Sequence, residues 1–367
     1  MASFPNDITT DILSQLPVKS VARFRCVCKS WKSLLTGACF INAHFDRSSK
    51  YRTVSLLKYD DNNSSRIGVY RPHHRELSHL NPSSGHPSRY NVVDSCNGIL
   101  CLSVYYKDKP GLPDIFLWNP SIHECMVVPQ HHCRVSGLIA FGFNPLSGHL
   151  DDFKVVNINF NFGARTDCHS SRAQIYSLRS NSWKKIGNVF SSWLGRNLGH
   201  QVIFQNFICW GTHARVNGQI VASLVSFDMV EEVFREMALP DSMPSEEKFI
   251  TLFEGCLSLI VQNPSSQCYE VWTMKEFGVT ESWAKLYTTT VLMDGFLQCW
   301  PLGAASSGEV LFVKSFYCEL RLSLTSYVVS YDTRRREFEE FKVGVEAYCS
   351  SRLVNYTESL VSVVTRD

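Results

Sequence analysis

The chain has 367 residues, of which 44% are hydrophobic and 19% charged, and its formal net charge is +2. This composition is typical of a folded soluble protein and excludes a disordered chain, while the near-neutral charge argues against a general nucleic-acid or membrane-surface binder. We therefore expect neither nucleic acid nor membrane among its partners. The length accommodates one small module followed by a large all-β domain.

The fourteen cysteines are expected to stay reduced. The N-terminal sequence MASFPNDITT has neither the basic nor the apolar region of a secretory signal, so we expect the chain in the cytoplasm or the nucleus. Adjacent ligand types occur at His73-His74 and at residues 131–133, but no second pair follows at zinc-finger spacing and C-x-x-C is absent. We expect no metal and no cofactor.

Residues 4–40 predict two or three short amphipathic helices. Four apolar residues recur at the spacing of one helical face: Ile8, Ile12, Leu13 and Leu16. Asn6 and Asp7 suit the cap and the first turn of this helix. Pro17 lacks an amide hydrogen, so it ends the first helix and suits the first turn of the next.

Beyond Pro17, a second apolar stripe is predicted with a basic opposite face. Its apolar members step by three and four: Val21, Phe24, Cys28, Trp31 and Leu35. The basic residues are Arg23, Arg25, Lys29 and Lys32. A unit of about 40 residues rarely folds on its own core. These helices therefore either dock onto the downstream domain, which composition alone favours, or bind a partner that covers their apolar residues.

The same stretch resembles an F-box, the motif by which substrate receptors of cullin-RING ubiquitin ligases bind a Skp-type adaptor. The matching positions are Phe4-Pro5, residues 11–13, 16–20 and 23–31, and Phe40-Ile41 with His44. Phe4 departs from the more usual Leu but stays apolar and bulky. The resemblance favours a partner-binding module over residues 1–47.

The resemblance implies which residues contact the adaptor. They are Pro5, Ile8, Ile12, Leu13, Leu16, Pro17, Val21, Phe24, Val27, Cys28, Trp31 and Leu34. After this module, the polar residues 48–52 predict a short hinge.

From residue 48 to 367, short apolar and aromatic segments alternate with turn dipeptides such as Asn119-Pro120 and Asn144-Pro145. Many short strands with almost no helical periodicity predict an all-β sandwich, barrel or propeller.

Internal repetition favours the propeller. Val-Ser-Phe-Asp at residues 225–228 and Val-Ser-Tyr-Asp at 329–332 lie 104 positions apart, and Ser182-Trp183 and Ser282-Trp283 lie 100 apart. Offsets near 100 correspond to two kelch-like units of about 50 residues, each one four-stranded blade. We therefore predict about six blades, each burying its face on its neighbours.

This region is similar to the F-box-associated domain of plant F-box and F-box/kelch-repeat proteins, and the chain also resembles S-locus F-box receptors of pollen-incompatibility ribonucleases. The matching segments are residues 94–101, 117–121, 141–144, 152–156, 175–178, 182–183, 226–228, 271–276, 281–283 and 356–360. Asn206-Phe207 replaces the family's Asn-Gly, which disfavours a tight hairpin there. The expected fold is α+β by domain, with a helical F-box at 1–47 and an all-β propeller-like domain at 48–367.

The repeated phrases have structural interpretations. Trp118 is expected to be an inward aromatic that ends a strand at a turn, and Asp228 to accept hydrogen bonds from following backbone amides. Target contacts are expected on the loops at residues 107–114, 161–172, 188–200 and 293–300. The last two carry residues of the types that anchor interfaces, unless they are core aromatics: Phe190, Trp193, Phe296 and Trp300.

No catalytic motif is found. G-x-S-x-G, H-E-x-x-H, G-x-G-x-x-G and the P-loop are absent from the sequence. With the F-box resemblance, this predicts a non-catalytic receptor that binds a Skp-type adaptor, through it a cullin and a RING subunit, and an unknown target protein for ubiquitination and proteasomal degradation. The alternatives are a stand-alone propeller binding protein or lectin with a non-functional F-box, and a propeller hydrolase.

Overall fold

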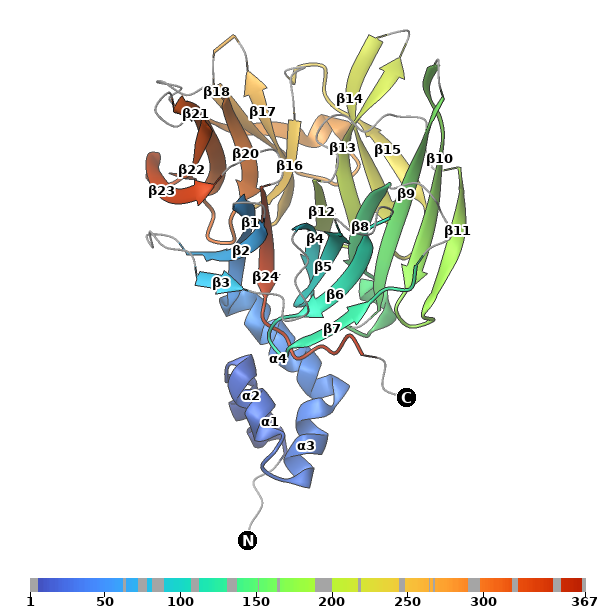
Figure 1. The fold of residues 1–367 in the computed structure, drawn as a ribbon, viewed down its shortest axis with the longest axis vertical. Helices are drawn as coiled ribbons and strands as arrows, with labels where there is room; N and C mark the ends of the chain where they lie inside the picture. The colour runs from blue at the N-terminus through green and yellow to red at the C-terminus, as the bar shows by residue number, and fades with distance from the viewer. Residues whose placement is uncertain are drawn as a thin grey trace.

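The computed structural model has two joined parts, a group of helices at one end and a ring of strands at the other (Figure 1). The structure describes residues 6–61, 64–71, 78–80, 89–106, 112–130, 137–150, 152–163, 166–188, 200–216, 219–243, 248–263, 265–266, 268–289, 298–318, 323–345 and 351–364. Among these residues, no helix has the length and apolar character that crossing a membrane would require.

The helical part contains the two helices that the sequence predicts around Pro17. Helix α1 (Asn6–Ser14) ends before it, and helix α2 (Val18–Phe24) begins after it, with Pro17 at the N-cap position at φ −58° and ψ 148°. Helix α3 (Lys29–Thr36) and the longer helix α4 (Ala38–Tyr51) follow. Three helices thus lie within residues 4–40, where two or three were expected, and α4 begins at the end of that stretch and continues beyond it.

The second apolar stripe is not one continuous helix, contrary to the prediction. The chain leaves α2 at Arg25 and re-enters a helix at Lys29, and Cys28 is extended at φ −158° and ψ 165°. Cys28 Sγ accepts a hydrogen bond from the Trp31 amide at 3.5 Å, which caps α3. Cys28 is consequently exposed instead of lying on a buried face. Spacing could not reveal the break, because steps of three and four continue across it.

Residues 48–52 do not form the predicted hinge, because α4 continues through most of them. Ser48 is buried, and its hydroxyl lies 3.5 Å from Nδ1 of the buried His44. The Arg52 guanidinium donates a hydrogen bond of 2.7 Å to the Leu16 carbonyl. Ser48 and Arg52, which suggest a solvated hinge, therefore have partners within the protein, and the connection to the ring is a helix that packs against α1 and α3.

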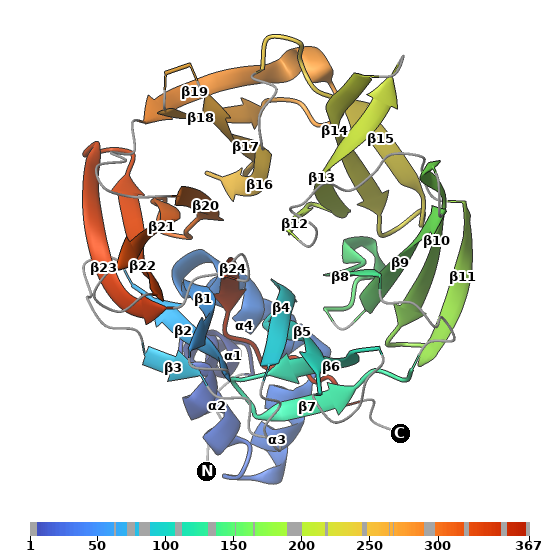
Figure 2. The same cartoon turned by 45° about the horizontal axis from the view of Figure 1, so that its top comes forward.

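The described strands form six four-stranded antiparallel sheets around a central axis, which confirms the predicted propeller (Figure 2). From the innermost strand outward, blade 1 is β24 (Arg352–Thr357), β1 (Thr53–Asp61), β2 (Ser64–Tyr70) and β3 (Ser78–Leu80); blade 2 is β4 (Arg89–Cys96), β5 (Ile99–Tyr105), β6 (Asp114–Asn119) and β7 (Glu124–Val127); blade 3 is β8 (Leu138–Phe143), β9 (Phe153–Gly163), β10 (Thr166–Ser177) and β11 (Ser182–Asn188).

The second half of the ring repeats this order. Blade 4 is β12 (Gln201–Phe204), β13 (Phe207–Val216), β14 (Gln219–Asp228) and β15 (Phe234–Ala238); blade 5 is β16 (Lys248–Phe253), β17 (Cys256–Asn263), β18 (Cys268–Met274) and β19 (Trp283–Thr289); blade 6 is β20 (Gln298–Ala304), β21 (Val310–Cys318), β22 (Ser323–Asp332) and β23 (Glu337–Val345).

Blade 1 closes the ring with strands from both halves of the chain. Strand β24 pairs antiparallel with β1, from Thr53 opposite Thr357 to Lys58 opposite Arg352. The hydroxyls of Thr53 and Thr357 lie 2.8 Å apart. Because β24 covers the inner edge of β1, that edge is paired within the chain instead of being open to another strand.

Apolar clusters fill the spaces between neighbouring blades. Strand β5 shows how: Leu100 and Leu102 pack in the cluster between blades 1 and 2, whereas Ile99 and Cys101 pack in the cluster between blades 2 and 3. Alternate side chains of a strand point to opposite faces. A central strand covered on both faces is therefore apolar throughout, which explains this uninterrupted apolar segment.

The turn residues act largely as predicted. Trp118 is buried at the end of β6. The Asp228 Oδ1 atom accepts hydrogen bonds from the amides of Val230 and Glu231. The hairpin between β12 and β13 does form, contrary to the expectation from Asn206-Phe207, because the turn falls one residue earlier and Gln205 adopts a left-handed φ of 55°.

Candidate protein-binding surfaces

The path of the chain gives the ring two different faces. Helix α4 leads directly into β1, so β1 starts at the helices and runs to the far face, and the antiparallel β24 returns (Figure 1). Each of the other blades repeats this antiparallel order, so its second strand also runs away from the helices. The connections after second and fourth strands consequently begin and end on the face opposite α1–α4.

All four predicted target loops are flanked by strand ends on this far face. Much of the 161–172 segment is strand, since β9 extends to Gly163 and β10 starts at Thr166. Trp300 lies in β20 and not in a loop; it is half-buried, and its ring packs edge-on against Phe249 with centroids 6.1 Å apart. That packing is compatible with the core-aromatic alternative, and its role as a target contact stays a prediction.

The other three proposed target contacts, Phe190, Trp193 and Phe296, lie outside the described residues, as does Pro5 of the proposed adaptor contacts.

The proposed adaptor contacts divide into surface and core. Ile8, Ile12 and Val27 are 49%, 55% and 62% exposed. Pro17 and Cys28 are also exposed. The half-buried members are Leu16, Phe24, Trp31 and Leu34, and the fully buried ones are Leu13 and Val21. The helical module thus presents large apolar side chains to solvent while keeping a core of its own.

The core of the helical module includes a residue from the other end of the chain. Leu13, Val21, Leu35 and Phe40 pack with Leu360, which is only 1% exposed. The helices therefore dock on the downstream domain, which is the first of the two alternatives posed by the sequence, and they still expose apolar residues, so partner binding stays a prediction. Nothing near residues 1–47 in the sequence indicates this distant contribution.

Residues 358–364 cross the helix side of the ring and bind blade 2 (Figure 1). The buried Asn119 Nδ2 donates hydrogen bonds to the carbonyls of Ser359 and Val361, at 3.1 and 2.7 Å. The carboxylate of Glu124 accepts from the Ser362 hydroxyl at 2.6 Å. This segment, which we call the C-terminal strap, therefore holds the helices and the propeller together.

A cavity of about 370 Å³ lies beside the strap, between α3, α4 and blade 3. Its lining includes the apolar Ile41, Leu150 and Leu178 together with His149 and Arg179.

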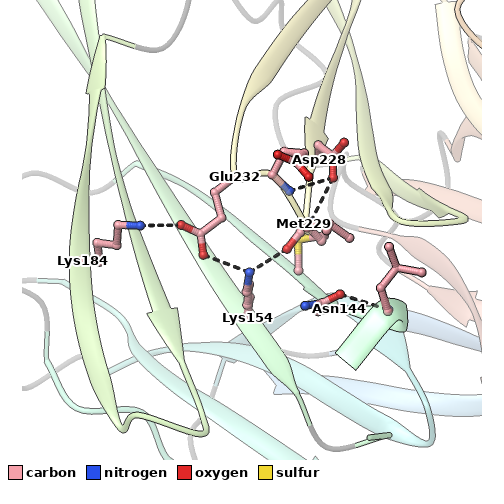
Figure 3. A network of polar contacts seen from close by, with 9 residues as sticks. Asn144, Lys154, Lys184, Asp228, Met229 and Glu232 are labelled. Atoms are coloured by element: carbon pink, nitrogen blue, oxygen red, sulfur yellow. Dashed lines mark hydrogen bonds and ion pairs between the residues drawn. The ribbon is translucent and has the colours of Figure 1, made fainter. Parts of the chain in front are cut away.

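A partly buried ion-pair network joins blades 3 and 4 (Figure 3). The ammonium of Lys154 on β9 donates to Glu232 Oε1 at 2.9 Å and to the Met229 carbonyl at 2.6 Å, while Lys184 on β11 reaches Glu232 Oε2 at 2.8 Å. Partial burial acts to raise the pKa of Glu232, but the hydrogen bonds from Lys184 and Lys154 outweigh it and lower that pKa. The network fixes one blade against the next.

A second polar network lies on the innermost strands. Arg352 on β24 stands 3.6 Å from the carboxylate of Asp94 on β4 and donates to the carbonyl of Gln201 on β12 at 3.2 Å. The Gln201 amide in turn donates to Asp94 at 2.9 Å. Burial raises the pKa of Asp94 against the opposing effect of Arg352, and burial next to Arg352 lowers the pKa of His200 to about 4.

The charged side chains of these two networks bind groups on neighbouring blades. We therefore assign them a structural role. Among the described residues, no group of three or more His, Cys, Asp or Glu side chains is arranged to hold a metal ion. The binding features that the described residues do present are the exposed apolar side chains of the helices and the strand ends of the far face.

The chain matches two known protein families. The F-box domain matches residues 1–42, and the F-box associated beta propeller domain matches residues 41–363. The two matches overlap within α4, and the domain boundary after residue 47 stays a prediction.

Several Arabidopsis thaliana proteins are similar to the chain. F-box protein At3g07870 is 28% identical, covering 93% of this chain and 87% of that protein. F-box/kelch-repeat protein At3g23880 is 27% identical, covering 81% and 82%, and F-box protein CPR1 is 27% identical, covering 78% and 73%. Among solved structures, TolB from Acinetobacter baumannii aligns with a TM-score of 0.46 at 12% identity, over 86% of this chain and 72% of that chain.

Proposed function

Because the chain belongs to the F-box proteins that carry an F-box associated β-propeller, we propose that it is the substrate-recognition subunit of an SCF-type (Skp-cullin-F-box) E3 ubiquitin ligase. In this role the helical module binds a Skp-type adaptor, and through it a cullin and a RING subunit, while the propeller binds a target protein. The subunit itself is non-catalytic. It acts by holding the target near a ubiquitin-charged enzyme, which raises the effective concentration of target lysines.

The observation that carries the proposal is the exposure of Ile8, Ile12 and Val27 on helices whose core is already filled, with Leu360 among its members. Several large apolar side chains exposed on one small helical unit are typical of a protein-binding surface. The strand ends that flank the candidate target loops lie on the opposite face of the ring, so an adaptor and a target can bind together without competing.

Co-expression with a plant Skp-type adaptor followed by size-exclusion chromatography tests the proposal. We expect the two proteins to co-elute, and the double variant Ile12→Asp with Val27→Asp to lose the adaptor, because charges replace the apolar contact. These exposed positions avoid the module's own core. Leu286→Asp is the matched control, an exposed apolar residue of β19 at 43% exposure, and should bind as the unmodified chain does.

Loss of binding in the Leu286→Asp control, or co-elution that survives the double variant, would contradict this placement of the interface. A folded, monodisperse chain that never binds the adaptor would contradict the proposed function itself.

We propose the cytoplasm or the nucleus as the site of action, in keeping with the expectation of fourteen reduced cysteines. A fluorescent fusion expressed in plant cells tests this: signal in either compartment is expected, and signal confined to the secretory pathway would contradict it.

A further inference from the structure

The charge of the chain is concentrated in its helical part. Residues 1–52 contain eight lysines and arginines and three aspartates, a net charge of +5, whereas the whole chain carries +2. Between Asp11 and Asp46 there are five basic residues and no acidic one. The rest of the chain is therefore slightly acidic, and the helices form a basic end on a near-neutral protein.

Five of the basic side chains have no partner within the part of the chain that the structure describes. Arg25 donates to the Leu35 carbonyl, Arg47 pairs with Asp11, and Arg52 bonds to carbonyls between α1 and α2. The five that are exposed and make no hydrogen bond or ion pair with described residues are Lys19, Arg23, Lys29, Lys32 and Lys50. Lys50 lies in the last turn of α4, and we call the other four residues the basic rim.

The three lysines of the basic rim stand at positions that a helix dipole disfavours, whereas Arg23 lies in the last turn of α2, which suits a cation. Lys29 and Lys32 lie in the first turn of α3, and Lys19 in the first turn of α2, and neither helix has an acidic residue there. The positive end of a helix dipole repels cations. In addition, Lys19 and Arg23 are separated by four residues on α2, the spacing at which like charges repel. The three lysines are therefore unfavourable for the isolated helices, and an external acidic partner would offset that cost.

Two residues of the rim also flank the exposed Val27 along the chain. Val27, at 62% exposure, lies in the turn between α2 and α3, with Arg23 before it and Lys29 after it. An apolar centre with a charged border is the usual composition of a protein–protein interface.

We propose that the basic rim binds an acidic surface of the adaptor that borders its contact with Ile12 and Val27. This inference rests on the proposed function and adds the charge of the partner to it. Opposite charges steer two proteins into their encounter and act mainly on the association rate, in a manner that salt screens. The rim thus sets how fast the ligase assembles, while the apolar centre sets how long it lasts.

Association and dissociation rates of the full chain with a purified plant Skp-type adaptor test this, at about 0.05 M and about 0.5 M NaCl. At low salt we expect the double variant Lys29→Glu with Lys32→Glu to associate at least about tenfold more slowly than the unmodified chain. Its association rate should depend less on salt, and its dissociation rate should be similar. The conservative pair Lys29→Arg with Lys32→Arg should restore the unmodified rate.

The matched control reverses charge elsewhere. Arg334→Glu with Arg336→Glu makes the same change in net charge on the exposed turn between β22 and β23, and should associate as the unmodified chain does. If both reversals slow association equally, or if the rim reversal leaves rate and salt dependence unchanged, the proposal is overturned.

Two other outcomes separate the rim from the function. Normal adaptor kinetics in the rim variant, together with lost binding to phosphatidylserine vesicles or RNA, would overturn the proposal and assign the rim to that partner. Absence of adaptor binding by the unmodified, folded chain would instead overturn the proposed function on which the inference rests.

Discussion

Two turns of the propeller share a backbone conformation but differ in what surrounds them. Asn97-Gly98 has φ values of 48° and 78°, and Glu254-Gly255 has 48° and 76°. A β-carbon added at Gly98 would lie 2.2 Å from the Ser359 β-carbon, whereas one at Gly255 would have nothing within 4 Å. Gly98 is therefore required for the close approach of the C-terminal strap as well as for its left-handed φ.

This pair of turns gives a controlled prediction. We expect Gly255→Ala to lower the free energy of unfolding by about 1–2 kcal/mol, the strain of a left-handed alanine. Gly98→Ala should cost clearly more, because the strap must also move away. Urea unfolding monitored by circular dichroism measures both, and equal losses would contradict the claimed contact.

The two lysines that pair with Glu232 should contribute differently to stability. Lys154 is 8% exposed, whereas Lys184 is 73% exposed. We expect Lys154→Met to lower the free energy of unfolding by about 2–4 kcal/mol, since it removes buried charge-assisted hydrogen bonds. Lys184→Met should change it little, because solvent screens an exposed pair. Thermal unfolding of both variants checks this; a larger effect at Lys184 would be inconsistent with the network.

Residue roles could be predicted where the partner is local. Asp228 ends its strand and accepts hydrogen bonds from the amides two and three residues ahead, so its role could be predicted from the sequence. Lys154 and Asp94 were not readable, because Glu232 and Arg352 come from other blades and no spacing relates them.

At the scale of elements, the strap completes the helical module. Leu360 fills the core between α1, α2, α3 and α4 immediately after β24 has closed the ring. A group of short helices has too little apolar surface to be stable alone. The helices that we propose to bind the adaptor therefore depend on residues that follow the last strand of the propeller.

Leu360→Ala should lower the stability of the helices by about 2–5 kcal/mol, the usual cost of a buried leucine cavity. Val364→Ala is the matched control on the same strap; this residue is 53% exposed, so its loss should cost at most about 0.5 kcal/mol. Hydrogen exchange of amides in α1–α4 reads out the difference. Helices that exchange equally slowly in both variants would rule out the structural role of Leu360.

The sequence predicted α1, the boundary at Pro17 and the start of α2, because helix capping and the effect of proline depend on neighbouring residues only. It missed the break before Lys29, where the apolar spacing continues through a non-helical turn. It also missed that residues 48–52 belong largely to α4, because Ser48 and Arg52 look solvated until the carbonyl of Leu16 and the ring of His44 are placed beside them.

At the scale of the whole molecule, the repeat offsets in the sequence correspond to blades. Asp228 ends β14 of blade 4 and Asp332 ends β22 of blade 6, two blades apart as the spacing of 104 residues indicates. The ring closure was not predictable in this way, because β1 and β24 pair across almost the entire chain and leave no periodic signal.

In the proposed complex, the adaptor binds the helices and leaves the far face of the propeller free. Hydrogen exchange of the full chain with and without a plant Skp-type adaptor tests it most directly. We expect slower exchange in α1 and in residues 23–34, and unchanged exchange at the strand ends opposite the helices. Protection confined to the propeller, or none in the presence of saturating adaptor, would contradict the account.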